Sequence, residues 1–274
     1  MAHTEQLDEQ SAIALLRWYA DMGVDEAVGT APADLYSWGS PAPETTTAPQ
    51  VSTLKNQPPA TPVFKADTEI VSTDEAIEKA KRAAMACESY EALEAAIDAF
   101  EDCPLKAGAK NTVFADGVPG ADLLVIGEGP GRDEDRLGKP FVGRAGQLLD
   151  RMLAAIGRDR TENTLISNVV YWRPPGNRTP TQAETAVCRP FVDRLIELTA
   201  PKAIVLAGGA PMQALLGITG IMRARGTWRE IETPDGARYP ALPIFHPAFL
   251  LRQPANKRLA WADLQALEAK LRES

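Results

Sequence analysis

Three polar residues that could take part in catalysis stand at or near the ends of apolar runs. Glu128 follows the run DLLVIG, Asn168 lies within the run TLISNVVYW, and His246 ends the run ALPIFH. Ligands of open α/β sheets bind beyond the carboxyl ends of the parallel strands. If the three runs are such strands, these side chains meet in one pocket, and the convergence is the strongest sign of a site that spacing alone provides.

A glycine-rich loop, GEGPG, joins the first apolar run to the acidic run 133–135. A dinucleotide site needs the spacing G-x-G-x-x-G and a helix start that faces the pyrophosphate, whereas the glycines here are Gly127, Gly129 and Gly131. No Gly-Lys-Ser/Thr follows, and the acidic run would repel a phosphate. The loop is therefore not predicted to bind phosphate. Its plainest interpretation is a tight turn before a helix whose acidic start complements the helix dipole.

Asn168, Phe141 and His246 each have a structural and a functional interpretation. A buried amide must be hydrogen-bonded, so Asn168 either braces the fold or reads a planar ligand, because a carboxamide presents a donor beside an acceptor, as a nucleobase edge does. Phe141, on the loop GKPFVGRAG, is either a core residue or a stacking face for a base. His246 is the only histidine outside the N-terminal tail, and its place before a proline at a strand end favours the pocket over ordinary packing.

The elements that would position these residues alternate along the C-terminal two thirds of the chain. We predict strands at 122–127, 164–172, 202–208 and 241–246, and helices at 146–157, 181–199, 210–217 and 256–272. Such alternation predicts an α/β fold, with a mainly parallel sheet covered by helices on both faces. Two further helices are predicted before the first strand, at 74–84 and 89–101.

The N-terminal part has a different character. Residues 7–23 show helical spacing of apolar residues, so 1–28 is predicted to be a helical segment, and the Pro/Thr/Ala-rich stretch 29–70 is predicted to be a flexible linker. An α/β domain would then span 71–274.

The charge distribution and the numbers of cysteine and histidine residues limit the kinds of function open to the chain. Residues 1–102 hold six basic against 19 acidic residues, a net charge of −13, whereas 103–274 hold 23 against 18, a net charge of +5. The C-terminal part is thus compatible with a polyanionic partner. The three cysteines are too few for a disulfide scaffold, and the two histidines exclude a histidine-rich metal site. No apolar run is long enough to span a membrane and no secretory signal is seen, so we expect a cytoplasmic protein without a membrane partner.

Three longer stretches resemble the family 4 branch of the uracil-DNA glycosylase superfamily: GEGPGRDEDRLGKPFVGRAGQLLDRML, SNVVYWRPPGNRTP and FHPAFLLRQPANKRLAWADL. The resemblance covers residues 99–272 and implies a parallel four-stranded sheet between helices, which makes 71–274 a uracil-DNA glycosylase domain. It also implies a monofunctional enzyme that flips deoxyuridine out of single- or double-stranded DNA and hydrolyses the N-glycosidic bond, leaving an abasic site for base-excision repair. We expect this enzyme to be a monomer.

The resemblance also implies roles for individual residues. By motif position, Phe141 would stack on the flipped uracil, Asn168 would bond its O4/N3 edge and reject cytosine, and His246 would donate to O2 as charge builds up on the leaving base. Gly127, Glu128 and Gly129 would form the pocket wall, where small residues let the backbone approach a flat neutral base.

The resemblance supplies no matching residue for the water-activating group. The best-known branch of the superfamily carries a water-orienting aspartate at the position of Gly129. Glu134 is our candidate for holding the water instead. Its alternative role is to close the pocket near uracil C5 and exclude thymine.

Contacts with DNA are expected on either side of the pocket. Leu250 and Leu251 follow His246 in a segment expected to be an exposed loop, where one of them could fill the space left by the flipped base; ordinary packing is the alternative for Leu250. Arg252 could hold a phosphate, and Arg178 is a further predicted DNA contact.

The chain departs from family 4 in its cysteines. Members of that family bind a [4Fe–4S] cluster through four cysteines. Cys103 and Cys188 match two of those positions, but Phe100 and Trp172 occupy the other two, and Cys87 matches none. Because three cysteines cannot supply four thiolate ligands, we expect the cluster to be absent, with Cys103 and Cys188 left as neighbouring reduced thiols; a retained [4Fe–4S] cluster is the alternative.

Two other functions remain open on the sequence alone. A glycosylase of this fold could prefer another deaminated base, such as hypoxanthine or xanthine. The glycine at 129 and the missing cluster ligands also leave room for a catalytically inactive DNA-binding relative.

Overall fold

The computed structural model of the protein describes residues 72–273. The predictions of a helical segment at 1–28 and a linker at 29–70 lie outside this range. Within the described range, none of the helices combines the length and the apolar character that crossing a membrane requires.

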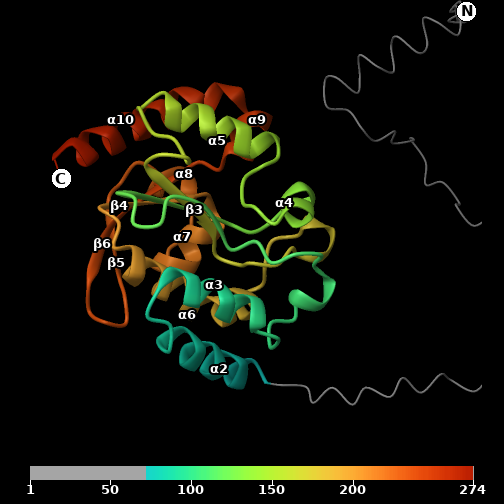
Figure 1. Cartoon of the computed structure of the whole chain (residues 1–274). Helices are drawn as coiled ribbons and strands as arrows, with labels where there is room; N and C mark the ends of the chain where they lie inside the picture. The colour runs from blue at the N-terminus through green and yellow to red at the C-terminus, as the bar shows by residue number, and fades with distance from the viewer. Residues whose placement is uncertain (1–71, 274) are drawn as a thin grey trace, which may run out of the picture. The chain divides into compact units, whose positions relative to one another are not determined.

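A six-stranded sheet forms the centre of the domain (Figure 1), in the order β1-β3-β2-β4-β6-β5. Its strands are β1 (Ala115–Gly117), β2 (Leu123–Gly127), β3 (Thr164–Asn168), β4 (Ala203–Ala207), β5 (Arg229–Glu232) and β6 (Arg238–Ile244). The four central strands run parallel, which confirms the predicted parallel core. Short antiparallel strands, β1 and β5, are added at the two edges and were not predicted.

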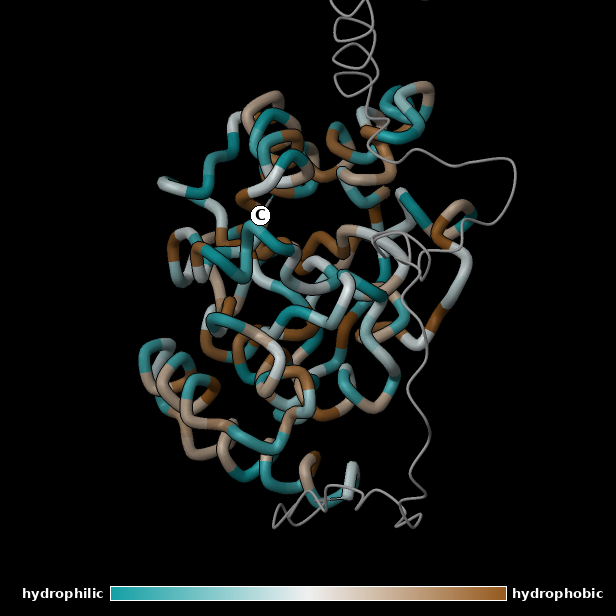
Figure 2. The backbone as a smooth tube through the Cα atoms, turned by 90° about the vertical axis from the view of Figure 1, so that its right-hand side faces the viewer, coloured by the Kyte–Doolittle hydropathy of each residue, from teal (hydrophilic) through white to brown (hydrophobic). Residues whose placement is uncertain are grey.

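Helices cover both faces of the sheet and give the expected three layers. One face carries α2 (Thr73–Met85), α3 (Tyr90–Ala99), α6 (Gln182–Thr199) and α7 (Gly209–Leu216), and the other carries α5 (Arg144–Ala154), α9 (Pro247–Arg252) and α10 (Lys257–Glu273). Strand β2 packs against both layers of helices. Leu124 and Ile126 belong to the first core, on the face covered by α2, α3, α6 and α7, while Leu123 and Val125 belong to the second core, on the face covered by α5, α9 and α10. The helices are amphipathic, as these two-sided contacts require. Figure 2 shows hydrophobic and hydrophilic residues alternating along their turns.

The predicted helices and strands are found within a few residues of their expected bounds. The strand predicted at 164–172 is shorter and ends at Asn168. Helix α4 (Arg132–Leu137) is the helix with an acidic start that was expected after the glycine-rich loop, whereas α8 (Ile221–Ala224) and α9 were not predicted. With four to six residues each, they offer too little apolar periodicity to be recognised.

Helix α9 corrects one prediction about DNA contacts. The segment after His246 is helical rather than an exposed loop, and Pro247 at its first position suits a helix start. The turn of this helix directs Leu250 inward, where it is only 1% exposed and packs with Phe245 and Leu264 in the second core. The expectation that Leu250 is exposed to DNA is therefore wrong in this conformation, and Leu251, which is half-buried, is the residue left for that role.

Candidate active site

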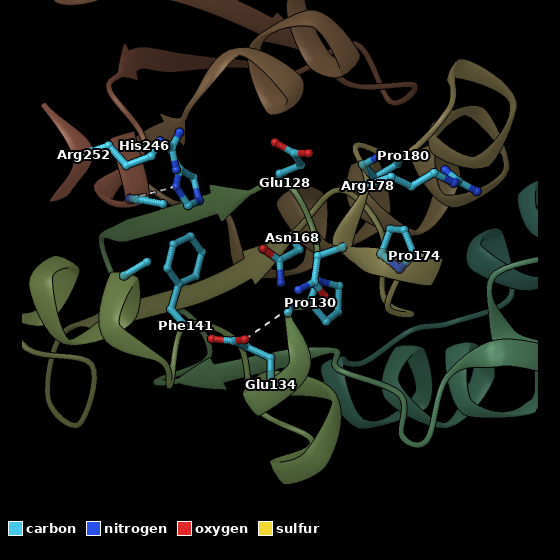
Figure 3. Close-up of a pocket in the computed structure, with 15 residues that line it drawn as sticks. Glu128, Pro130, Glu134, Phe141, Asn168, Pro174, Arg178, Pro180, His246 and Arg252 are labelled. Atoms are coloured by element: carbon cyan, nitrogen blue, oxygen red, sulfur yellow. Dashed lines mark hydrogen bonds between the residues drawn. The ribbon is translucent and has the colours of Figure 1, made fainter. Parts of the chain in front are cut away.

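The carboxyl ends of the parallel strands open into one pocket of about 540 Å³ (Figure 3). The predicted site residues that line it are Glu128, Gly129, Glu134, Phe141, Asn168, Arg178, His246 and Arg252. The convergence expected from the strand ends is thus confirmed. In Figure 3 the side chains of Phe141, Asn168 and His246 point toward the same space from three different elements.

The floor of the pocket depends on the missing side chain of Gly127. In the β2–β3 ladder Gly127 pairs with Asn168. A Cβ atom at 127 would collide with the ring of Phe141 and the amide oxygen of Asn168. Glycine is therefore needed here because an aromatic ring and a carboxamide approach the backbone from two sides.

Asn168 presents an unsatisfied donor to the pocket. It is the last residue of β3 and is 2% exposed, and its Nδ2 has no hydrogen-bond partner within residues 72–273. A buried donor without a partner costs about 1–3 kcal/mol. This side chain does not brace the fold through that nitrogen, so its amide is available to a ligand.

Phe141 is both packed and strained. It is 6% exposed and belongs to the second core, and its ring lies 5.6 Å from the ring of His246, inclined by 30°. Its φ of +52° places an aromatic residue in the left-handed region, which persists only when the surroundings enforce it.

Glu134 connects the two loops that flank the pocket. Its carboxylate accepts hydrogen bonds from the backbone N–H groups of Gly131 at 3.1 Å, Val142 at 3.0 Å and Gly143 at 2.9 Å. The first of these bonds lies at the start of α4, where Glu134 reaches back to the backbone N–H of the N-cap residue Gly131. Both carboxylate oxygens are therefore already engaged by the fold.

Asp135 explains a second part of the acidic run. It is buried, and its Oδ1 accepts from the backbone N–H groups of Lys110 at 2.7 Å and Asn111 at 3.2 Å. The acidic residues after the glycine loop thus satisfy backbone donors, as the interpretation of an ordinary helix start predicted in part.

Glu128 contrasts with Glu134. It lines the pocket directly after β2 and makes no hydrogen bond or ion pair with any part of the chain that the structure describes. It is thus the pocket carboxylate whose oxygens are free to bind a water or a ligand.

His246 is held as a neutral donor. It caps α9, and its Nδ1 accepts the backbone N–H of Ala248 at 3.1 Å. In the neutral ring the proton therefore resides on Nε2. Burial, reinforced by the nearby charge of Arg252 and partly opposed by Glu134, lowers the pKa of His246 to about 4.

Gly208 makes room behind the histidine. Its φ is +109°, and a Cβ atom there would lie 3.1 Å from the Cβ of His246. Gly208 therefore leaves space for His246 and does not itself line the pocket.

The two arginines of the pocket differ in their availability. Arg178 donates to both carboxylate oxygens of Glu184, at 2.8 and 2.6 Å, so its charge is already compensated. Arg252 is exposed and has no hydrogen bond or ion pair among the described residues.

The four positions matched to cluster cysteines belong to the first core, and one of them, Cys188, is a residue of α6. Cys103 and Cys188 are buried, and the hydrogen bond between their thiols lowers the pKa of Cys103 and raises that of Cys188. Their predicted proximity is confirmed. Phe100 packs edge-on against Phe191, with ring centroids 5.2 Å apart. Trp172 is 1% exposed, and its Nε1 donates to Thr112 Oγ1 at 3.2 Å.

Several parts of the site were missed by sequence reasoning. Further lining comes from Pro130, Gly131, Ala145, Pro174, Asn177, Pro180 and Ala248. Most of these are neighbours of predicted residues within the three quoted stretches, so their place in the motifs is the signal that would have found them. Arg160, which contacts the backbone of Phe141, gives no such signal.

Comparisons with known proteins agree with this geometry. Residues 114–265 match the family model described as the uracil DNA glycosylase superfamily. The chain is 37% identical over 165 residues to the type-4 uracil-DNA glycosylase of Thermotoga maritima and 38% identical over 170 residues to that of Archaeoglobus fulgidus, in each case over 60% of this chain and 84% of the relative. It is 32% identical over 188 residues to the type-4 enzyme of Sulfurisphaera tokodaii, over 66% of this chain and 84% of that relative.

The protonation of His246 gives a direct test of the site. We expect its ring to stay neutral from pH 8 down to pH 5 and to become charged only near pH 4, because its pKa is lowered by burial. Since the chain has only two histidines, NMR of the histidine ring protons would resolve both titrations, with His246→Gln and His3→Gln as assignment controls. A midpoint near 6.5 for the His246 signal would contradict the assigned environment.

Proposed function

The chain belongs to the uracil-DNA glycosylase superfamily, and on this premise we propose that it is a uracil-DNA glycosylase. It flips deoxyuridine out of DNA, hydrolyses the N-glycosidic bond and leaves an abasic site for base-excision repair. Flipping costs a few kcal/mol of unstacking, which the pocket must return through contacts with the extruded base.

The buried, unpaired Nδ2 of Asn168 is the observation that carries this proposal. Uracil offers an acceptor at O4 beside a donor at N3, so one carboxamide can bond both atoms. Cytosine presents the reverse pattern and would leave the amide opposed by like groups. The ring of Phe141 supplies the stacking face, and the pairing of Gly127 with Asn168 keeps both side chains at the floor of the pocket.

His246 fits the electronic demand of the reaction. Cleavage builds positive charge on the sugar and negative charge on the departing uracil, so a fixed donor at O2 stabilises the transition state more than the ground state. A neutral imidazole with its proton on Nε2 is such a donor, and the bond from Ala248 keeps this tautomer in place. The low pKa means that the ring acts as a hydrogen-bond donor across physiological pH rather than as a charged acid.

The attacking water requires an acceptor in the pocket. Gly129 offers no side chain, and both oxygens of Glu134 are engaged by backbone donors. We therefore assign the water to Glu128. This revises the initial preference for Glu134, which instead holds the loops around the base; exclusion of thymine near C5 remains its second role.

Whether the enzyme holds an iron–sulfur cluster depends on whether its residues can bind one. The resemblance implies a [4Fe–4S] cluster, but two of its four ligand positions hold aromatic side chains packed into the core, and the described residues contain no group of three or more His, Cys, Asp or Glu side chains suited to a metal ion. The residues therefore do not fit the cluster, and we propose an enzyme without one. DNA is the partner; uracil in single or double strands is the proposed substrate, and a cytoplasmic monomer is the proposed form.

Base specificity tests the proposed function. The wild-type protein should release uracil from a U-containing oligonucleotide, visible as strand cleavage after alkali, and should do so faster than it acts on hypoxanthine, xanthine or thymine. Asn168→Asp should lower the single-turnover rate by about 100-fold or more, because a carboxylate places an acceptor against O4. Absence of uracil-dependent cleavage by the wild type would refute the function. A preference for hypoxanthine or xanthine would assign it to another deaminated base.

A matched pair of variants separates the two glutamates. Glu128→Gln should lower the single-turnover rate by roughly 100-fold, as for loss of a general base, with an unchanged melting temperature, since Glu128 has no partner to lose. Glu134→Gln should lower the melting temperature, because the new amide cannot accept all three backbone N–H groups. If Glu128→Gln keeps the wild-type rate, the water belongs to another group.

Iron content tests the proposed absence of the cluster. Protein purified without oxygen from iron-supplemented cells should be colourless, lack absorbance near 400 nm and contain no stoichiometric iron. Four iron atoms per chain, with that absorbance, would restore the cluster to the enzyme and would require two ligands in addition to Cys103 and Cys188.

A further inference from the structure

Arg160 is a half-buried arginine in the loop between α5 and β3, beside the candidate active site. Its side chain is only 14% exposed, and it does not line the pocket. An arginine withdrawn from solvent needs partners for all of its donors, so its contacts reveal what it holds in place.

Two carboxylates fix the orientation of the Arg160 guanidinium. Nη1 donates to Asp116 Oδ2 at 2.9 Å, while Nε and Nη2 donate to Asp150 Oδ1 at 2.9 and 2.7 Å. Asp116 comes from the edge strand β1 and Asp150 from helix α5. The planar fork is thereby locked between two separate elements.

The remaining donors of the fork reach the backbone of the stacking loop. Nη1 donates to the carbonyl of Pro140 at 3.1 Å and Nη2 to the carbonyl of Phe141 at 2.8 Å. On the following peptides Glu134 Oε1 accepts the N–H groups of Val142 and Gly143. The strained residue Phe141 is therefore held between a cation that binds carbonyls and an anion that binds amides.

The backbone of the loop at Phe141 also packs tightly against Gly146 of α5. A Cβ atom at Gly146 would collide with the carbonyl of Phe141. The left-handed φ of Phe141 directs its ring over Gly127 and beside His246. Backbone strain of this kind costs about 1–3 kcal/mol and must be offset by surrounding contacts.

We propose that Arg160 is a positioning residue that acts through Phe141: it holds the strained backbone so that the ring is set for stacking on the base before DNA binds. This inference rests on the proposed function for its effect on rate. It makes Arg160 part of the catalytic apparatus although the residue touches neither the base nor the water.

A double-mutant cycle tests this role. Arg160→Lys keeps the charge but cannot bind two carbonyls and two carboxylates at once. It should lower the single-turnover rate on a uracil-containing oligonucleotide by about 10- to 100-fold, as expected for a small misplacement of a substrate-positioning group. In a Phe141→Ala background the same change should have a much smaller effect, because the ring that it positions is gone. Equal factors in both backgrounds would overturn the proposal, since a merely structural role lowers the rate independently of the ring.

Controls keep this test separate from that of the function. Arg158→Lys changes an arginine of the same loop whose side chain makes no hydrogen bond or ion pair with residues 140–143, and it should leave the rate unchanged. If Arg160→Lys does not fold, Asp150→Asn removes one orienting carboxylate whose side chain is 47% exposed, and the same cycle applies.

A readout without DNA decides the case in which the wild type releases no uracil. With 4-fluorophenylalanine placed at position 141, ¹⁹F NMR should give one sharp line in the wild type and in Arg158→Lys, and a shifted or broadened line in Arg160→Lys. Loss of activity in the wild type refutes the function alone, whereas an unchanged fluorine line in Arg160→Lys refutes the positioning role alone.

Discussion

The pairing of Gly127 with Asn168 at the carboxyl ends of β2 and β3 is the constraint on which the pocket depends. Parallel strands bring their ends to the same edge, and this register sets the carboxamide beside a residue that has no side chain. The space above Gly127 is then shared by the amide of Asn168 and the ring of Phe141. A larger residue at 127 would displace the ring of Phe141 or the carboxamide of Asn168, so the proposed recognition of a flat base depends on this backbone register.

Three residues around the floor of the pocket adopt states that lower the stability of the free protein. Asn168 keeps a buried donor unpaired, Phe141 adopts a left-handed backbone, and His246 is neutral at the expense of its normal basicity. Each feature is unfavourable in the free protein and becomes useful only with a ligand. Functional sites commonly contain such locally unfavourable features. The opposing carboxylate and guanidinium at the loop of Phe141 are the local interactions that make such strain tolerable.

The fold was largely predictable because its central strands are continuous apolar runs and its long helices are periodic. The edge strands were not, since ADG and REIE are short and carry no apolar alternation. Asn168 and His246 could be found from their places at strand ends. Leu250 was misplaced because a helix of only six residues turns it into the core. Arg160 gave no signal, because its importance arises from carbonyls and carboxylates that meet only in the folded chain.

The two cores explain why the proposed absence of the cluster is compatible with uracil-DNA glycosylase chemistry. The positions matched to its ligands belong to the core beneath α2, α3 and α6, whereas Phe141 and the helix that follows His246 belong to the core on the opposite face. The four positions join segments distant in sequence. Phe100 packs on Phe191 of α6, and the free thiol of Cys103 interacts with the free thiol of Cys188 in the same helix. Of the four positions, Trp172 lies nearest in sequence to the pocket, since it directly precedes the loop of Pro174 and Arg178 that lines the pocket. Its burial and its bond to Thr112 anchor the start of that loop. Aromatic packing therefore joins the segments that a cluster would join, and the sheet separates these positions from Phe141 and from the helix that follows His246.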